Sequence, residues 1–131
     1  MTQLHPTEPI ATFEHEVPAS QAGRFFDAVA WQLPTRPASP PTLATTFRHG
    51  EFAALQKLGV ALQNVLHGEQ KYRFHGELKS GTRYRGETFV NSHYAKSGGS
   101  GTMNFYVFQT NLKDGAGALA VECVTTIIVR S

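Results

Sequence analysis

The chain has 131 residues, 40% of them hydrophobic and 17% charged, and a formal net charge of +2. This length and composition fit one soluble domain with a single core and exclude a disordered chain. The cations are scattered instead of forming a basic stripe, which argues against nucleic-acid binding, and no apolar run approaches the roughly 20 residues of a membrane span. The N-terminal residues lack a basic and apolar leader, so a cytoplasmic location is expected.

The first part of the chain is expected to form a strand, a helix and an irregular connection. Residues 10–17 have the pattern of a strand that Pro18 ends. Residues 19–31 have the spacing of an amphipathic helix, with its apolar positions at Ala22, Phe25, Phe26 and Val29. Residues 33–42 hold four of the seven prolines. They are expected to be irregular, because proline fixes φ and lacks a donor.

A second helix is expected over residues 43–59, with Gly59 at its end. Apolar and small side chains occupy most of its circumference: Phe47, Phe52, Leu55 and Leu58, with Ala44, Ala53 and Ala54 nearby. A helix of this kind is buried on more than one side. A sheet wrapped around the helix would bury it in this way.

Strands separated by turn sequences follow this helix. They are expected over residues 70–78, 84–94, 103–112 and 118–130, with turns at 79–82, 96–101 and 113–117. The third of these strands is apolar on both faces, which indicates a central position. Consecutive hairpins imply an antiparallel sheet, whose exposed face could be covered by a second subunit. The expected fold class is α+β, an antiparallel sheet wrapped around a central helix, in a single domain over residues 1–131.

Several short segments match the pattern of one known family. They are Pro40–Thr42, Val65–Gln70 (Val-Leu-His-Gly-Glu-Gln), Leu78–Thr82 and Gly98–Phe105. Through these segments the chain resembles the FAS1-like dehydratase domain of the MaoC-like hotdog superfamily. The resemblance extends over about residues 10–130, which is nearly the whole chain.

The resemblance implies a hotdog fold and a lyase role with acyl thioesters in fatty acid metabolism. In this family enoyl thioesters are hydrated, or 3-hydroxyacyl thioesters dehydrated, with the acyl group carried on coenzyme A or acyl carrier protein. The domain often holds the acyl chain, while a second hotdog supplies the catalytic residues. A homodimer, or a heterodimer with a MaoC-like subunit, is therefore implied, without a cofactor besides the thioester carrier.

One segment departs from the pattern of the active members of the superfamily. After the first helix they carry an Asp-x-Asn-Pro-x-x-His-like segment, which supplies an acid/base pair. Here that place reads Ala30-Trp31-Gln32-Leu33-Pro34-Thr35, with neither an acid nor a histidine. The resemblance thus implies the fold, whereas catalysis by this chain alone lacks its usual residues.

Two groups of side chains are candidates for catalysis. Dehydration needs a base for the C2 proton and an acid for the leaving hydroxyl. His67 and Glu69 are two positions apart, so on a strand they would share a face and form such a pair; alternatively, they only anchor the start of the strand. Glu51 lies on the central helix, where thioesterases of this fold place the carboxylate that activates water. Alternatively, it is a structural carboxylate near a helix N-terminus.

Candidates for substrate binding lie on the central helix and around the glycine-rich turn. Phe47, Phe52 and Leu55 would line an acyl tunnel. The turn, with Gly98 and Gly99, could present N–H groups to a phosphate of coenzyme A, or be only a flexible hairpin. The cations that flank it, candidates for the same phosphates, are Arg83, Arg85 and Lys96. The six histidines lack the spacing of a metal site, so none is expected.

Three functions stay open on the sequence. The first is an acyl-thioester-binding subunit of a (3R)-hydroxyacyl-thioester dehydratase, which needs a MaoC-like catalytic partner. The second is a self-sufficient enzyme, either an enoyl-thioester hydratase using His67 and Glu69 or a thioesterase using Glu51. The third is a non-enzymatic module that binds acyl thioesters.

Overall fold

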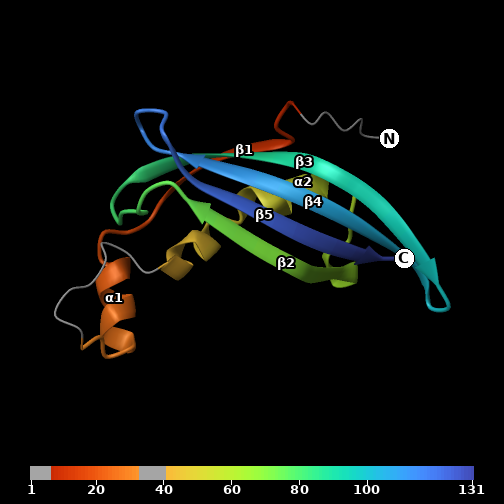
Figure 1. Cartoon of the computed structure of the whole chain (residues 1–131), viewed down its shortest axis with the longest axis horizontal. Helices are drawn as coiled ribbons and strands as arrows, with labels where there is room; N and C mark the ends of the chain where they lie inside the picture. The colour runs from red at the N-terminus through yellow and green to blue at the C-terminus, as the bar shows by residue number, and fades with distance from the viewer. Residues whose placement is uncertain (1–6, 33–40) are drawn as a thin grey trace.

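The computed structural model describes residues 7–32 and 41–131 of the chain (Figure 1). Its elements are β1 (Ala11–Glu16), α1 (Gln21–Ala28), the 3-10 helix η1 (Pro41–Thr46), α2 (His49–Lys57), the 3-10 helix η2 (Leu62–Asn64), β2 (Val65–Phe74), β3 (Arg83–Gly98), β4 (Gly101–Lys113) and β5 (Leu119–Arg130). The sheet curves around α2, and α1 stands at one end of the molecule. This is the sheet wrapped around a helix that the sequence predicted.

The five strands form one antiparallel sheet in the order β1-β3-β4-β5-β2. The predicted central position of β4 is confirmed. The prediction of consecutive hairpins is wrong for β2 and β3, which lie on different sides of the sheet. Leu78, expected in a strand, lies instead in the connection between them and is 2% exposed. Burial of this side chain holds the connection against the core, so the chain crosses from one edge of the sheet toward the other.

The second predicted helix is broken into two pieces. Residues 41–46 form η1, and α2 begins only at His49. The hydroxyls of Thr45 and Thr46 donate hydrogen bonds to carbonyl oxygens three residues earlier, at 2.7 and 2.8 Å. Threonine side chains that bond the local backbone compete with regular helix, which accounts for the break.

The first helix and the strands also differ in extent from the prediction. In α1 the predicted apolar stripe is only partly buried, because Phe25 and Val29 are 37% and 52% exposed. Strand β2 begins at Val65, before the predicted start, and β3 continues to Gly98 through the first half of the predicted glycine-rich turn. The predicted irregular segment 33–42 lies largely outside the described residues. Among these residues, none of the helices has the length and apolarity that crossing a membrane requires.

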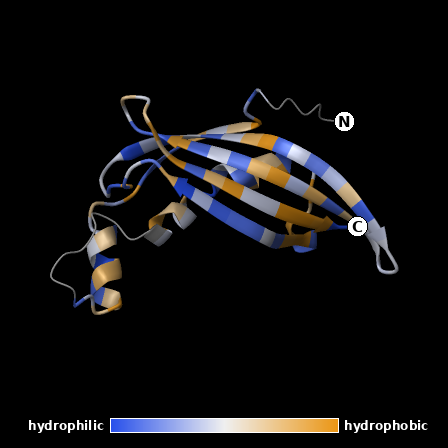
Figure 2. Ribbon diagram, viewed as in Figure 1, coloured by the Kyte–Doolittle hydropathy of each residue, from blue (hydrophilic) through white to orange (hydrophobic). Residues whose placement is uncertain are grey.

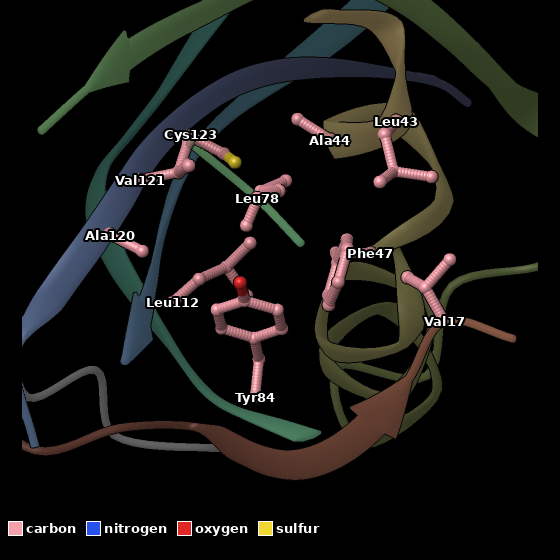
Figure 3. Packing of buried hydrophobic residues seen from close by; sticks show 10 residues of the cluster. All are labelled: Val17, Leu43, Ala44, Phe47, Leu78, Tyr84, Leu112, Ala120, Val121 and Cys123. Carbon is pink, nitrogen blue, oxygen red and sulfur yellow. The ribbon is translucent and has the colours of Figure 1, made fainter. Parts of the chain in front are cut away.

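The interior contains two apolar clusters on the inner face of the sheet, the first packed against η1 and the second against α2. The strands of the sheet alternate in hydropathy (Figure 2). The first comprises Val17, Leu43, Ala44, Phe47, Leu78, Tyr84, Leu112, Ala120, Val121 and Cys123. Figure 3 shows Phe47 and Val17 of this cluster facing the side chains of the sheet. The second comprises Ala54, Leu55, Val90, Phe108 and Ile127. A buried threonine lies between the two clusters on each of β3, β4 and β5: Thr88, Thr110 and Thr125.

Candidate functional site

A layer of polar side chains crosses the interior at the start of α2. Thr88 and Thr110 lie on neighbouring strands, with their hydroxyl oxygens 2.8 Å apart. Thr125 continues the layer on β5, and Glu51 of α2 meets it from the helix side. All four side chains are buried. Buried polar groups are costly unless they are hydrogen-bonded, and here each one has a partner.

Both carboxylate oxygens of Glu51 are occupied. The Nε and Nη2 atoms of Arg48 lie 3.0 Å from Oε2, and the Thr125 hydroxyl donates to Oε1 at 2.5 Å. The side chain of Glu51 is 3% exposed, whereas that of Arg48 is 36% exposed. The ion pair therefore has its anion inside the protein and its cation near the surface. Breaking such a pair by removing its cation would leave an uncompensated buried charge, which is strongly destabilising.

Gly50 allows α2 to begin this close to the sheet. A Cβ atom at this position would lie 1.9 Å from Oγ1 of Thr88 and 3.0 Å from the ring of Phe13. No real side chain fits at these distances, so glycine is required for the observed packing. The close approach brings the neighbouring Glu51 within reach of Thr125.

The polar layer extends to the edge strand β2. Oε1 of Gln70 lies 2.8 Å from the Thr125 hydroxyl and 3.1 Å from Nε2 of His67. A hydroxyl has one proton, so Thr125 can donate to either Glu51 or Gln70. With the Gln70 amide reversed, its N–H groups donate to Thr125 and His67 while Thr125 donates to Glu51. A continuous hydrogen-bonded chain then connects Arg48 to His67.

A bulge at Gly68 decides which residues of β2 share a face. His67 pairs with Ile127 and Gln70 with Thr125, and both partners are buried. Glu69 pairs instead with Thr126, on the opposite face. The prediction that His67 and Glu69 share a face is therefore wrong, because the extra residue shifts the register between them.

The sequence interpretation missed Gln70 and Thr125 as members of the site. Glu69 points away from His67 and forms a 3.3 Å ion pair with Lys71 on the outer face. A glycine inside a strand pattern is itself a signal for a bulge, and that signal is present in the His-Gly-Glu-Gln segment.

The three side chains predicted to line an acyl tunnel do not share one surface. Phe47 and Leu55 are both 2% exposed and belong to different apolar clusters. Phe52 is 49% exposed, and the guanidinium carbon of Arg48 lies 5.4 Å from its ring centroid. Phe52 thus faces outward beside the Arg48–Glu51 pair.

The predicted phosphate-binding cations are also separated. Arg83 stands at the start of β3 and lies 3.5 Å from Glu14 and 4.0 Å from Glu16. Arg85 is nearby, whereas Lys96 and Gly98 lie at the other end of the same strand and Gly99 in the turn after it. At about 3.3 Å per residue, Arg85 and Lys96 are roughly 35 Å apart along the strand. Arg85 and Lys96 therefore cannot both contact one phosphate group.

Cys123 and the carboxylates do not form a nucleophile or metal site. Burial, and secondarily Glu51, raises the pKa of the Cys123 thiol to about 12, so the thiol stays protonated at neutral pH. Across residues 7–32 and 41–131, no three His, Cys, Asp or Glu side chains are grouped to hold a metal ion.

Two histidines join β1 to the start of α2. Nδ1 of His15 lies 3.2 Å from Nε2 of His49, and the ring of His15 meets the edge of Phe47 at a centroid distance of 4.8 Å. Burial, and secondarily the neighbouring His49, lowers the pKa of His15 from its ordinary value. The contact therefore favours the neutral form of His15.

The free energy of unfolding is expected to fall as the pH drops below about 6.5. In the unfolded chain His15 is protonated near its ordinary pKa of 6.5. In the folded protein the pKa of His15 is lower, so protonation is disfavoured. The contribution of His15 to the free energy of unfolding is thus present above about pH 6.5 and decreases as the pH falls below it. Urea unfolding between about pH 5 and pH 8 measures the effect. His15→Gln should flatten the slope, and identical slopes would contradict the assignment.

One family matches most of the chain. The family described as FAS1-like, dehydratase domain region, matches residues 14–123. No curated protein matches the sequence significantly.

Three solved structures illustrate the fold. The HadBC (3R)-hydroxyacyl-ACP dehydratase complex of Mycobacterium tuberculosis is similar at 17% identity and TM-score 0.66, over 88% of this chain and 90% of that chain. The ChsH1-ChsH2 complex of the same organism is similar at 12% identity and TM-score 0.67, over 93% and 84%. A hypothetical protein of Staphylococcus aureus in complex with CoA is similar at 10% identity and TM-score 0.65, over 97% and 73%. At these identities the likeness shows the hotdog fold.

Proposed function

Because the chain belongs to the family of FAS1-like dehydratase domain regions, we propose that it is an acyl-thioester-binding subunit of a 3-hydroxyacyl-thioester dehydratase. Its ligand is an acyl group on coenzyme A or on acyl carrier protein. A MaoC-like partner subunit supplies the acid and the base. The observation that carries this proposal is the engagement of both oxygens of Glu51 by Arg48 and Thr125.

The arrangement of the candidate catalytic groups supports a binding role. A general base needs a free lone pair within reach of the proton that it removes. Glu51 is buried and accepts hydrogen bonds at both oxygens, one ring nitrogen of His67 is hydrogen-bonded to Gln70, and Glu69 lies on the opposite face of β2. Within the described residues these three side chains do not converge as an acid/base pair. The predicted binding roles of Arg83, Arg85 and Lys96 stay predictions.

The edge strand β2 supports association with another subunit. It pairs with β5 on one side and has no second neighbour in the sheet formed by the described residues. An exposed strand edge is a template for pairing with a strand of another chain. Leu66 on this strand is 43% exposed, and a partner at this edge would cover its apolar side chain. The partner is either a second copy or a MaoC-like subunit.

Hydration of enoyl thioesters tests the proposal. The pure protein should bind crotonyl-, octenoyl- or cinnamoyl-coenzyme A but leave the enoyl absorbance unchanged. Adding a MaoC-like partner that carries the Asp/His segment should start turnover, with a rate above that of the partner alone. Efficient hydration by the isolated chain would overturn the proposal.

A thioesterase that uses Glu51 is the second candidate, favoured by the position of this carboxylate in the first turn of the buried helix. Thiol release from acyl-coenzyme A would measure it. Under our proposal Glu51→Gln, His67→Ala and Glu69→Gln leave the negligible rate of the isolated chain unchanged. A rate that is measurable in the wild type and abolished in folded Glu51→Gln would establish the thioesterase instead. If the protein binds acyl thioesters but no partner produces hydration or hydrolysis, the non-enzymatic acyl-thioester-binding module would be the remaining function.

A further inference from the structure

Six side chains form two rows on the outer face of the sheet, at the end where β3 and β4 join. Cross-strand register places Tyr94, Phe105 and Ile128 side by side, and then Lys96, Met103 and Arg130. Residues two apart on a strand share a face. The adjacent Tyr106 and Ile127 pack in the interior cluster around α2, so the six residues face the other way. These six residues are termed the outer platform.

The outer platform exposes aromatic and sulfur-containing side chains. Tyr94 and Met103 are 44% and 37% exposed. The rings of Tyr94 and Phe105 are stacked, with centroids 4.8 Å apart and an interplanar angle of 5°. The ammonium of Lys96 lies 5.2 Å from the centroid of Phe105 and 5.9 Å from that of Tyr94. Aromatic residues, Met and Arg are the types enriched at the centres of protein interfaces.

The charge of the outer platform is positive and is not neutralised by neighbouring residues. The sequence has no Asp or Glu between residues 88 and 113, nor between 123 and 131. Within the described residues neither Lys96 nor Arg130 forms an ion pair, and the acid of the adjacent strand, Glu69, is bonded to Lys71. At the other end of the same face, by contrast, Arg83 and Lys113 are paired with glutamates.

We propose that the outer platform docks an amphipathic helix of another protein, whose apolar side is flanked by Asp and Glu. Three strands about 4.8 Å apart span roughly 10 Å, which is the width of one helix. The apolar residues of such a helix would cover Tyr94, Phe105 and Met103. Its acidic residues would reach Lys96 and Arg130 at the rim, where charge complementarity gives specificity.

Other occupants fit these observations less well. A symmetric contact between two copies would bring the like charges of Lys96 and Arg130 together. Attraction to an anionic membrane relies on clusters of about four to eight cations, and the platform has two. The platform also lies on the face of the sheet opposite α2, so its occupancy does not involve Glu51 or the polar layer. Lys96 is also one of the predicted contacts of coenzyme A, and competition with coenzyme A separates the two roles.

Binding of a fluorescently labelled synthetic helix to the full chain tests the proposal. The peptide has leucines on one side with glutamates flanking them, and a second peptide has lysines in place of the glutamates. Fluorescence anisotropy should show binding of the acidic peptide alone, weakening as salt is raised. Lys96→Glu with Arg130→Glu should weaken it by at least about tenfold. Lys79→Glu, the reversal of one charge in a distant connection, should leave it unchanged.

Four outcomes would overturn the proposal. They are absence of binding by the acidic peptide, equal binding by both peptides, equal binding by wild type and a folded Lys96→Glu/Arg130→Glu variant, and displacement of the peptide by coenzyme A. Circular dichroism checks the fold, and Lys96→Gln with Arg130→Gln replaces the charge reversal if that variant unfolds. Sedimentation of the chain alone measures self-association, and sedimentation with anionic phospholipid vesicles measures membrane binding. Self-association or vesicle binding that requires Lys96 and Arg130, without peptide binding, would assign the platform to them.

Discussion

Arg48→Met is expected to lower the free energy of unfolding by about 3–5 kcal/mol, the cost of leaving a buried charge without its partner. The Glu51 carboxylate would keep only the Thr125 hydroxyl, because both contacts at its second oxygen come from Arg48. Methionine retains an apolar stem that packs in place of the arginine chain. Urea unfolding followed by circular dichroism measures the loss.

The reverse substitution provides the control for Arg48→Met. Glu51→Gln leaves Arg48, which is 36% exposed and can return to water, so a smaller loss of about 1–3 kcal/mol is expected. Combining Arg48→Met with Glu51→Gln should cost less than the sum of the two single losses, because the effects of substituting residues in contact are not additive. A loss below about 1 kcal/mol for Arg48→Met would contradict a buried pair, since that is the value of exposed pairs.

The order of these losses bears on function as well as on stability. A carboxylate whose two oxygens serve the folded structure is a poor general base, because using it would require breaking the contact with Arg48 or Thr125. If Arg48→Met costs more than Glu51→Gln, the ion pair serves to stabilise the buried Glu51 carboxylate, which joins α2 to β5 through Thr125. That outcome is the one expected for a subunit that shapes an acyl-binding surface.

Local patterns were sufficient to predict most of the elements. The period-two sequences gave the strands, and the apolar positions on both faces of β4 predicted its central place. The central helix was predicted from its apolar circumference, although the threonine hydroxyls of residues 45 and 46 divide it. Phe52 looked like a core residue by type but is exposed, because α2 presents that side away from the sheet.

The candidate site depends on contacts that no local pattern contains. Thr125 is 74 positions from Glu51 and 55 from Gln70. The pairing of β2 with β5 brings them together, and nothing in the sequence between them specifies that pairing. An acid/base pair of His67 and Glu69 was one of two alternatives for the His-Gly-Glu-Gln segment, yet its glycine forms a bulge that separates these residues. The segment therefore has a structural role, because Gln70 and His67 extend the hydrogen bonds of the interior to the edge strand.

Gly50→Ala is expected to destabilise the protein by about 2 kcal/mol or more, within the usual cost of overpacking. The added methyl carbon would lie 1.9 Å from Oγ1 of Thr88, which is itself fully buried and bonded to Thr110. Thr88 therefore cannot move aside without losing that hydrogen bond. Alanine favours a helix over glycine by up to about 1 kcal/mol, which offsets only part of the strain. Thermal and urea unfolding measure the net effect.

Gly23→Ala is the matched control for Gly50→Ala, because it makes the same change in α1, where an added Cβ meets no atom within 4 Å. It should raise the free energy of unfolding by roughly 0.5–1 kcal/mol through helix propensity alone. Thr88→Ala in the Gly50→Ala background removes the nearest atom and leaves the Cβ of residue 88 at 2.9 Å, so part of the loss should be recovered. Equal and favourable effects of the two glycine substitutions would contradict the close contact of α2 with the sheet. In that case the polar layer joining Glu51 to Thr125 would have a different geometry. The close approach at Gly50 would then no longer explain why both oxygens of Glu51 are hydrogen-bonded.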